Sequence, residues 1–138
     1  MFFKKKREHT LLEDIEIFSE WIVDIMETSG YRADYSMESL KEIDRFIIEE
    51  DRAEGLLSKD IGKTIFALGS YVGKTFIKEY GGHWITNDRD RKGEMKIIVE
   101  LDNDISFMPV MSVMKYYSNH EETSIYMLSL AIKQSSQE

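Results

Sequence analysis

Residues 61–84 read IGKTIFALGSYVGKTFIKEYGGHW, and this stretch decides the fold. Its apolar side chains recur at helical spacing and cover a wider arc than the stripe of an ordinary surface helix. Gly81 and Gly82 then supply the left-handed backbone that commonly ends a helix. We therefore predict a long central helix that is capped at its start by Ser58, packed on two sides and followed at once by a strand. The apolar arc consists of Ile61, Ile65, Phe66, Leu68, Val72, Phe76, Ile77 and Tyr80.

Glycines occupy three positions in the apolar arc of this central helix: Gly62, Gly69 and Gly73. A glycine costs about 1 kcal/mol relative to alanine in a helix interior, so three on one face need an explanation. Close approach of another backbone is one explanation, and a groove of small residues left open for a ligand is the other. The opposite face is predicted to be a small basic strip exposed to solvent. Its residues are Lys63, Ser70, Tyr71, Lys74 and Lys78.

The composition favours one globular domain without disulfide or thiolate chemistry. The chain has 138 residues, a single proline and no cysteine, which excludes disulfides and cysteine-ligated metals. Its formal net charge of −8 argues against non-specific nucleic-acid binding, which depends on neutralising phosphates with basic residues. Charged residues interrupt every apolar stretch before it reaches about 20 residues. We therefore predict a cytoplasmic protein with no transmembrane segment and no nucleic-acid partner.

The two ends of the chain differ from its middle. Residues 1–9, MFFKKKREH, lack the apolar core of a secretory signal, and we predict a disordered basic tail there. The alternative is a weak anchor to anionic lipid, with Phe2 and Phe3 inserting beside the basic residues. Residues 134–138, QSSQE, are predicted to form a second disordered tail, which leaves residues 10–133 as the folded domain.

The first predicted helix starts at Thr10, since Glu13 three residues later completes a capping box. Ser36 is predicted to cap a second helix. No basic residue occurs between Thr10 and Tyr31, so the outer face of the first helix is acidic. This face is either an ordinary solvated surface or a docking surface for a basic partner protein. The residues predicted to carry that interaction are Glu13, Glu16, Glu20 and Asp24.

After the central helix the apolar pattern changes to alternation, which is typical of strands. We predict strands at residues 83–87, 95–101 and 105–108, joined by polar turns into an antiparallel meander. Pro109 suits the first position of a following short helix, and a last helix is predicted at residues 121–133. The fold class is therefore α+β, with three N-terminal helices including the long central one, a three-stranded antiparallel meander and two C-terminal helices.

The common catalytic signatures are absent from the sequence, which has no nucleophile elbow, no phosphate loop and no His-Glu-x-x-His motif. We predict no catalytic residue, no metal site and no cofactor. A place where a long helix meets a sheet is a common location for a pocket. The candidate ligand-binding residues there are Tyr71, His83, Trp84 and Lys115. In the alternative interpretation, Trp84 only packs beneath the central helix and His83 points into solvent.

Methionines gather in the C-terminal part of the chain. Methionine adapts to irregular gaps, so we interpret them as core fillers, and a homodimer interface is the alternative. They are Met108, Met111, Met114 and Met127.

Three short motifs support a resemblance to a known kind of domain. They are a Ser-x-x-Ser-Leu helix start, a Gly-x-Tyr-x-Gly within the central helix and a Gly-Gly-x-Trp at its exit. Over residues 34–132 the chain resembles a small bacterial α+β domain family of unknown function, so the resemblance implies a fold and no activity. The family often has an acidic residue directly after the second glycine, where this chain has Lys74. The matching positions are Ser36, Ser39, Leu40, Asp44, Gly69, Tyr71, Gly73, Gly81, Gly82, Trp84, Pro109 and Lys115.

These observations lead to three functional hypotheses, of which the third is a structural or self-associating domain with the methionine-rich helices as its dimer face. The first is a bacterial, cytoplasmic, non-enzymatic domain that binds another protein. Some small acidic bacterial domains of this kind resemble immunity proteins of toxin systems, which is an analogy at the level of the fold. The second hypothesis is a small-ligand-binding protein or an enzyme with a pocket between the central helix and the sheet.

Overall fold

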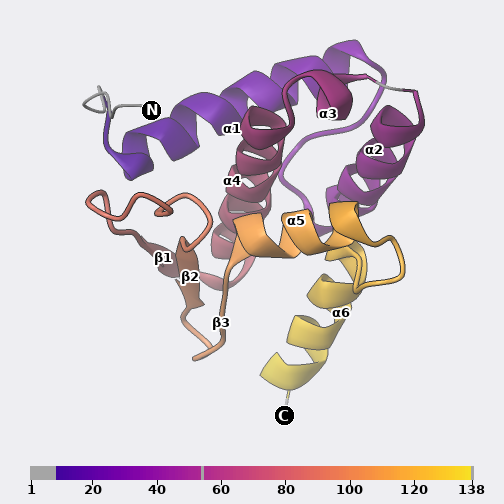
Figure 1. The fold of residues 1–138 in the computed structure, drawn as a ribbon. Coiled ribbons are helices and arrows are strands. Elements are labelled where there is room, and N and C mark those ends of the chain that lie inside the picture. Colours follow the sequence, from indigo (N-terminus) through magenta and orange to yellow (C-terminus); the bar gives the residue numbers. More distant parts are fainter. Residues whose placement is uncertain (1–8, 54, 138) are drawn as a thin grey trace.

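The computed structural model describes residues 9–53 and 55–137 and confirms the α+β class (Figure 1). The order of the elements matches the prediction, with the 3₁₀-helix η1 and the one-turn helix α3 added. The predicted basic tail lies outside the described residues, apart from His9. The elements are α1 (Leu11–Thr28), η1 (Met37–Ser39), α2 (Leu40–Arg52), α3 (Leu56–Lys59), α4 (Ile61–Tyr80), β1 (Gly82–Ile85), β2 (Ile98–Leu101), β3 (Ser106–Phe107), α5 (Pro109–Ser118) and α6 (Ile125–Ser136).

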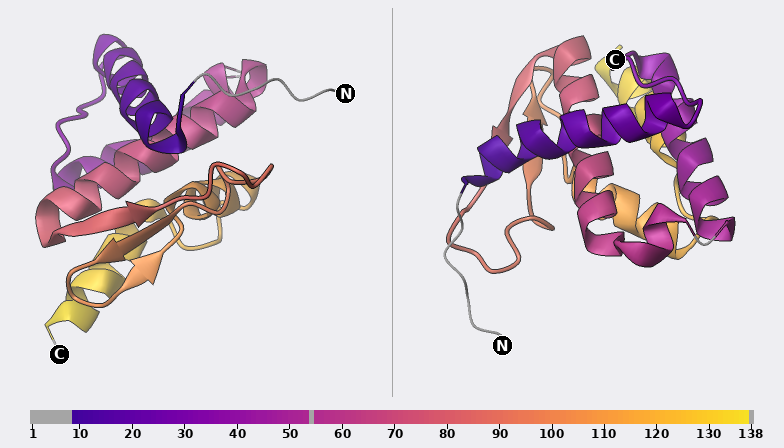
Figure 2. Two further views of the ribbon diagram at one scale, coloured as in Figure 1. Left: turned by 90° about the vertical axis from the view of Figure 1, so that its left-hand side faces the viewer. Right: turned by 90° about the horizontal axis from the view of Figure 1, so that it is seen from above.

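Helix α4 lies at the centre of the domain, as its wide apolar arc predicted. Figure 2 shows α4 between α1 on one side and the sheet with α5 on the other. Phe66 of α4 packs edge-to-face on Phe18 of α1, with ring centroids 5.4 Å apart. Phe76, further along α4, contacts Phe107 of β3 with ring centroids 4.7 Å apart. The helix is therefore packed on two sides, and its middle turns are buried.

The glycines of α4 do not share one explanation. A Cβ atom on Gly69 would lie 2.6 Å from the Cα of Val110, so close approach of the α5 backbone is confirmed there. A Cβ atom on Gly73 would overlap the indole ring of Trp84, which is a side chain and not a backbone. Gly62 has nothing within 4 Å of that position, so close packing is the wrong explanation for it. Since Val110 and Trp84 fill the space over the other two glycines, no small-residue groove is left open there.

The predicted basic strip on α4 is exposed at its two ends, Lys63 and Lys78, but the prediction is wrong for its middle. Ser70 and Tyr71 are buried. The Tyr71 hydroxyl accepts a hydrogen bond from the Tyr35 amide at 2.9 Å and lies 2.6 Å from the Ser39 hydroxyl. Lys74 meets a carboxylate of α1. The loop before α2, together with α1, therefore covers the middle of the face that sequence periodicity assigned to solvent.

Two of the predicted helix caps are present. The Thr10 hydroxyl accepts from the Glu13 amide at 3.1 Å, and the Glu13 carboxylate accepts from the Thr10 amide at 2.8 Å. This reciprocal pair is the predicted capping box of α1. The Ser36 hydroxyl accepts from the Ser39 amide at 3.1 Å, although the turn that it caps is η1 and not the first turn of α2.

The predicted cap of the central helix, Ser58, is wrong. Ser58 lies inside α3, and the N-cap of α4 is Asp60, whose side chain makes no capping hydrogen bond. The extra turn of helix has a packing reason, because it carries Leu57 into the core, where 1% of that residue is exposed. Burial of Leu57 thus decides where α4 begins, and capping preferences alone predicted an earlier start.

The sheet is the predicted antiparallel meander, with strand order β1-β2-β3. Trp84 pairs with Val99, and Val99 pairs in turn with Phe107. All three strands are shorter than predicted. In particular, Met95 and Lys96 lie in a turn in which their amides donate to the carbonyls of the preceding polar segment.

Helix α5 begins at Pro109 as predicted, but α6 begins and ends later than the predicted residues 121–133. The Ser124 hydroxyl and the Asp44 carboxylate fix its start, accepting hydrogen bonds from the Met127 amide at 3.1 Å and the Ile125 amide at 2.8 Å. At the other end, residues 134–136 are helical, so the prediction of a disordered tail is wrong for them.

The described helices also bear on the prediction that the chain has no transmembrane segment. Among residues 9–53 and 55–137, no helix combines the length and the apolar character needed to cross a membrane.

Candidate functional site

The acidic residues predicted to bind a partner all lie on the exposed side of α1, facing away from the core. The aliphatic side chains of Leu12 and Ile17 share this side, and they are 48% and 46% exposed. The surface is therefore acidic and partly apolar. We call it the α1 outer face, and it consists of Leu12, Glu13, Glu16, Ile17, Glu20 and Asp24.

Two of the four carboxylates on the α1 outer face have a structural partner. Glu13 belongs to the capping box, and Glu16 Oε1 lies 2.8 Å from the Nζ atom of Lys74 on α4. Burial is the largest single influence on the pKa of Lys74 and lowers it, but the hydrogen bond to Glu16 and the negative charges of Tyr35, Glu16 and Glu20 together outweigh burial, and that pKa is raised. Glu20 and Asp24 are exposed and form no ion pair or hydrogen bond with any other described side chain. These two carboxylates are the part of the face that is available to a partner.

Tyr71, one of the four candidate ligand-binding residues, has a structural role. Its ring stacks on Tyr35, with ring centroids 4.5 Å apart, and burial raises the pKa of the Tyr71 hydroxyl. The Ser39 hydroxyl donates to the Ser36 carbonyl at 2.6 Å, which leaves Tyr71 as the donor to Ser39. Tyr35 has a φ of 62°, which a non-glycine residue rarely adopts, and its amide donates to Tyr71. Tyr71 thus holds a left-handed loop residue in place and has no hydrogen-bonding capacity directed at a cavity.

His83 and Trp84 point in opposite directions from β1. The His83 side chain is 61% exposed, and its Nε2 atom lies 3.2 Å from Oε1 of Glu100 on the neighbouring strand. The Trp84 ring packs over Gly73 of α4. This arrangement agrees with the interpretation in which Trp84 packs beneath the central helix and His83 points into solvent.

Lys115 lies apart from these residues, on the exposed side of α5. It lines a shallow pocket of about 200 Å³ with Glu122 and three neutral residues. The structure therefore does not bring the four candidate ligand-binding residues together. Neither this pocket nor the larger one described next includes Tyr71, His83 or Trp84.

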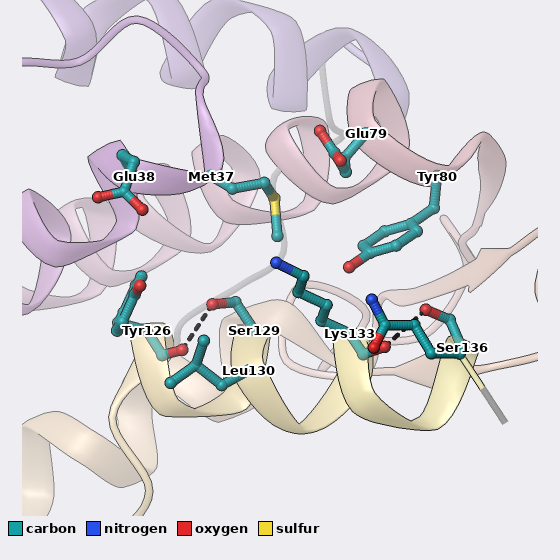
Figure 3. Close-up of a pocket in the computed structure, with 10 residues that line it drawn as sticks. Met37, Glu38, Glu79, Tyr80, Tyr126, Ser129, Leu130, Lys133 and Ser136 are labelled. Atoms are coloured by element: carbon teal, nitrogen blue, oxygen red, sulfur yellow. Dashed lines mark hydrogen bonds between the residues drawn. The ribbon is translucent and has the colours of Figure 1, made fainter.

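The larger pocket lies at the C-terminal end of α4, between η1 and α6, and has a volume of about 250 Å³ (Figure 3). Its position differs from the predicted one, because α6 and not the sheet forms its second wall. We call it the α4–α6 pocket. Its lining residues are Met37, Glu38, Glu79, Tyr80, Tyr126, Ser129, Leu130, Lys133, Ser136 and Gln137.

One charged group and one hydroxyl group of the α4–α6 pocket point into its interior. In Figure 3 the Lys133 ammonium and the Tyr80 hydroxyl are directed into the space between α4 and α6. Burial and the nearby negative charge of Glu79 raise the pKa of Tyr80, and a hydrogen bond with Ser136 lowers it by less, so that pKa is raised overall. Glu38 is paired with Lys41, whose Nζ atom lies 3.2 Å from the carboxylate. The Glu38 carboxylate is therefore neutralised by an ion pair, whereas Glu79 and Lys133, which also line the pocket, form no ion pair with each other.

Sequence reasoning missed this pocket because it ended the last helix at Lys133. A usable signal was present, since hydroxyl and basic side chains recur along α6 at helical spacing. They would have marked one polar side of a helix that continues past residue 133. They are Tyr126, Ser129, Lys133 and Ser136.

Among residues 9–53 and 55–137, no group of three or more His, Asp or Glu side chains is placed to hold a metal ion. Comparison with protein-family models, with curated proteins and with solved structures found no match to this chain. The resemblance to a small bacterial domain family stays a prediction.

Proposed function

We propose that this protein is a non-enzymatic interaction domain that binds a basic partner protein through the α1 outer face. The observation that carries the proposal is the combination of two unpaired carboxylates, Glu20 and Asp24, with two half-exposed aliphatic side chains, Leu12 and Ile17, on one helix face. Protein interfaces combine an apolar contact area with a polar rim. Complementary charge raises the association rate and excludes wrong partners.

The electrostatics favour a basic partner over an acidic or neutral one. The chain has a formal net charge of −8, and α1 contains no basic residue that would offset its own carboxylates. Of the described bases outside α1, Lys74 forms its ion pair with Glu16 and feels the charge of Glu20 more weakly, so Glu20 and Asp24 form no ion pair of their own with the described residues. We therefore expect a partner surface rich in lysine or arginine, with an apolar group positioned for Ile17. An immunity protein that neutralises a basic toxin is the specific version of this proposal.

The attachment of α1 to α4 makes its outer face a rigid platform. The Phe18–Phe66 contact and the Glu16–Lys74 ion pair fix α1 from below. A rigid face loses little conformational freedom on binding, so more of the interaction energy remains as affinity.

The experiment compares proteins captured from a lysate of the source organism by three forms of the chain. The wild type is compared with E20K/D24K, which reverses the two unpaired carboxylates and leaves the capping box and the Lys74 ion pair intact. E121K/E122K is the matched control, because it changes the net charge equally at exposed positions in the loop before α6. We expect a basic protein with the wild type and the control but not with E20K/D24K.

Two results would contradict the proposal. One is equal capture of the same partner by all three forms, and the other is the absence of any basic protein from the wild-type capture. A melting curve of each form checks that the substitutions leave the fold intact, since surface changes of this kind alter stability by about 0.5 kcal/mol or less.

A further inference from the structure

The α4–α6 pocket holds two opposite charges that do not meet. Glu79 comes from the end of α4 and Lys133 from the last turn of α6. Neither forms an ion pair within 4.0 Å with the other or with another charge among residues 9–53 and 55–137. Both nevertheless line the same 250 Å³ of space. Helices α4 and α6 therefore each contribute one unpaired charge to the lining of the pocket, the Glu79 carboxylate and the Lys133 ammonium.

The helix dipoles treat these two charges differently. Lys133 lies at the C-terminal end of α6, where the partial negative charge of the helix stabilises a cation. Glu79 lies at the C-terminal end of α4, where the same effect disfavours a carboxylate. A cation placed beside Glu79 would relieve that unfavourable interaction, so the Glu79 end of the pocket suits a positively charged group.

Hydroxyl and apolar groups complete the lining. The Tyr80 hydroxyl points into the pocket beside Lys133 (Figure 3) and hydrogen-bonds with the Ser136 hydroxyl, so it donates to an anion only by exchanging that partner. The hydroxyls of Ser129 and Ser136 already donate to the carbonyls of Tyr126 and Lys133, so they remain as acceptors only. Met37 and Leu130 supply apolar surface on the η1 and α6 sides.

The volume limits the size of an occupant. Pockets that hold drug-sized ligands measure roughly 300–1,000 Å³, and the α4–α6 pocket measures about 250 Å³. An occupant therefore has the size of a single amino acid. A ligand with one charge can contact either Glu79 or Lys133, whereas a ligand with both charges can contact the two together.

We propose that the α4–α6 pocket binds a small zwitterion, an α-amino acid with an apolar side chain. Its carboxylate contacts Lys133 and the Tyr80 hydroxyl, its ammonium contacts Glu79, and its side chain packs on Met37 and Leu130. This site is separate from the α1 outer face and does not depend on the function proposed for that face.

The test is a titration of the full, isotope-labelled chain with L-leucine, followed by NMR. Two derivatives isolate the charges, because N-acetyl-L-leucine lacks the ammonium and L-leucinamide lacks the carboxylate. Glycine, which has both charges and no side chain, tests the apolar contact. We expect L-leucine to shift the amide signals of Glu79, Leu130 and Lys133. Each of the other three compounds should bind at least about tenfold more weakly, since a charge-assisted hydrogen bond or a buried side chain is lost.

Substitutions then assign the contacts. E79Q and K133M should each weaken L-leucine binding by at least about tenfold, while E122Q and K115M, matched changes in the pocket on α5, should leave it unchanged. All four positions are exposed, so the variants should fold, which a melting curve checks.

The proposal is overturned if L-leucine causes no shift in these signals up to its solubility limit. It is also overturned if the derivatives bind as tightly as L-leucine, or if E79Q and K133M bind it like the wild type. The charge-reversed α1 variant E20K/D24K should bind L-leucine normally, so a failure of this proposal is distinguishable from a failure of the docking proposal.

Discussion

Charged side chains are paired where α1 contacts α4, but two that line the pocket between α4 and α6 do not pair with each other. At the first, Lys74 meets Glu16 at 2.8 Å, and the Lys63 ammonium lies 4.3 Å from the centre of the Trp21 ring. At the second, Glu79 and Lys133 line one space without pairing. One helix, α4, thus has a closed side that fixes α1 and an open end that can admit a small molecule. Paired charges therefore mark the contact that stabilises the fold, and unpaired charges mark the pocket where we propose binding.

The largest expected effect tests how strongly the closed side holds the fold. Phe66 is 3% exposed and packs on Phe18, so Phe66→Ala should lower the free energy of unfolding by about 3–5 kcal/mol, measured by urea denaturation. Leu130→Ala, on the open side and 41% exposed, is the control and should cost less than about 1 kcal/mol. Equal losses would show that the two regions do not differ.

The second prediction concerns Asp44, which fixes the α6 wall of the pocket. Its carboxylate accepts from the amides of Ile125 and Tyr126 at 2.8 and 3.0 Å. Asp44→Ala should therefore lower the free energy of unfolding by about 1–3 kcal/mol and speed hydrogen exchange in the first turn of α6. Asp44→Asn keeps an acceptor oxygen and should lose less. If both substitutions cost nothing, Asp44 does not hold α6.

The third prediction contrasts two glycines of α4. Gly69→Ala places a methyl group 2.6 Å from the Cα of Val110 and should destabilise the protein by about 1–3 kcal/mol. Gly62→Ala meets nothing within 4 Å and should stabilise it by up to about 1 kcal/mol. Thermal unfolding of the two variants should therefore move in opposite directions, and shifts of the same sign would contradict the packing described here.

The smallest expected effect comes from removing the ion pair between Lys74 and Glu16, on the side of α4 that contacts α1. Lys74→Met removes the contact with Glu16 and should cost no more than about 1 kcal/mol, because pairs of this exposure contribute little. The loss should shrink at high salt, where the ion pair is screened. Lys115→Met, which has no ion pair among the described residues, should show no such salt dependence. An effect of equal size in both variants would rule out a specific role for the pair.

Local patterns predicted most of the fold. The periodicity of residues 61–80 and the Gly-Gly stop gave α4, the Thr10–Glu13 spacing gave the start of α1, and alternation gave the meander. Each of these signals lies within a few residues of the element that it determines, which is why a single sequence is sufficient for them.

Contacts between distant segments account for the errors. Tyr71 was assigned to a solvent face, but its partners Tyr35 and Ser39 come from a loop that no local pattern places over α4. The start of α6 was predicted too early, because the residue that fixes its first turn, Asp44, lies far away in the sequence, in α2. The α4–α6 pocket depends on both ends of α6 and on η1, so it could not be predicted before those boundaries were known.

The most direct test of the central claim is the affinity of the α1 outer face for the basic protein recovered by the wild-type chain. Isothermal titration of that protein should give an affinity at least about tenfold weaker for E20K/D24K than for the wild type, equivalent to about 1.4 kcal/mol. The E121K/E122K control should retain the wild-type affinity. Equal affinities for all three forms would contradict the claim that α1 is the docking surface.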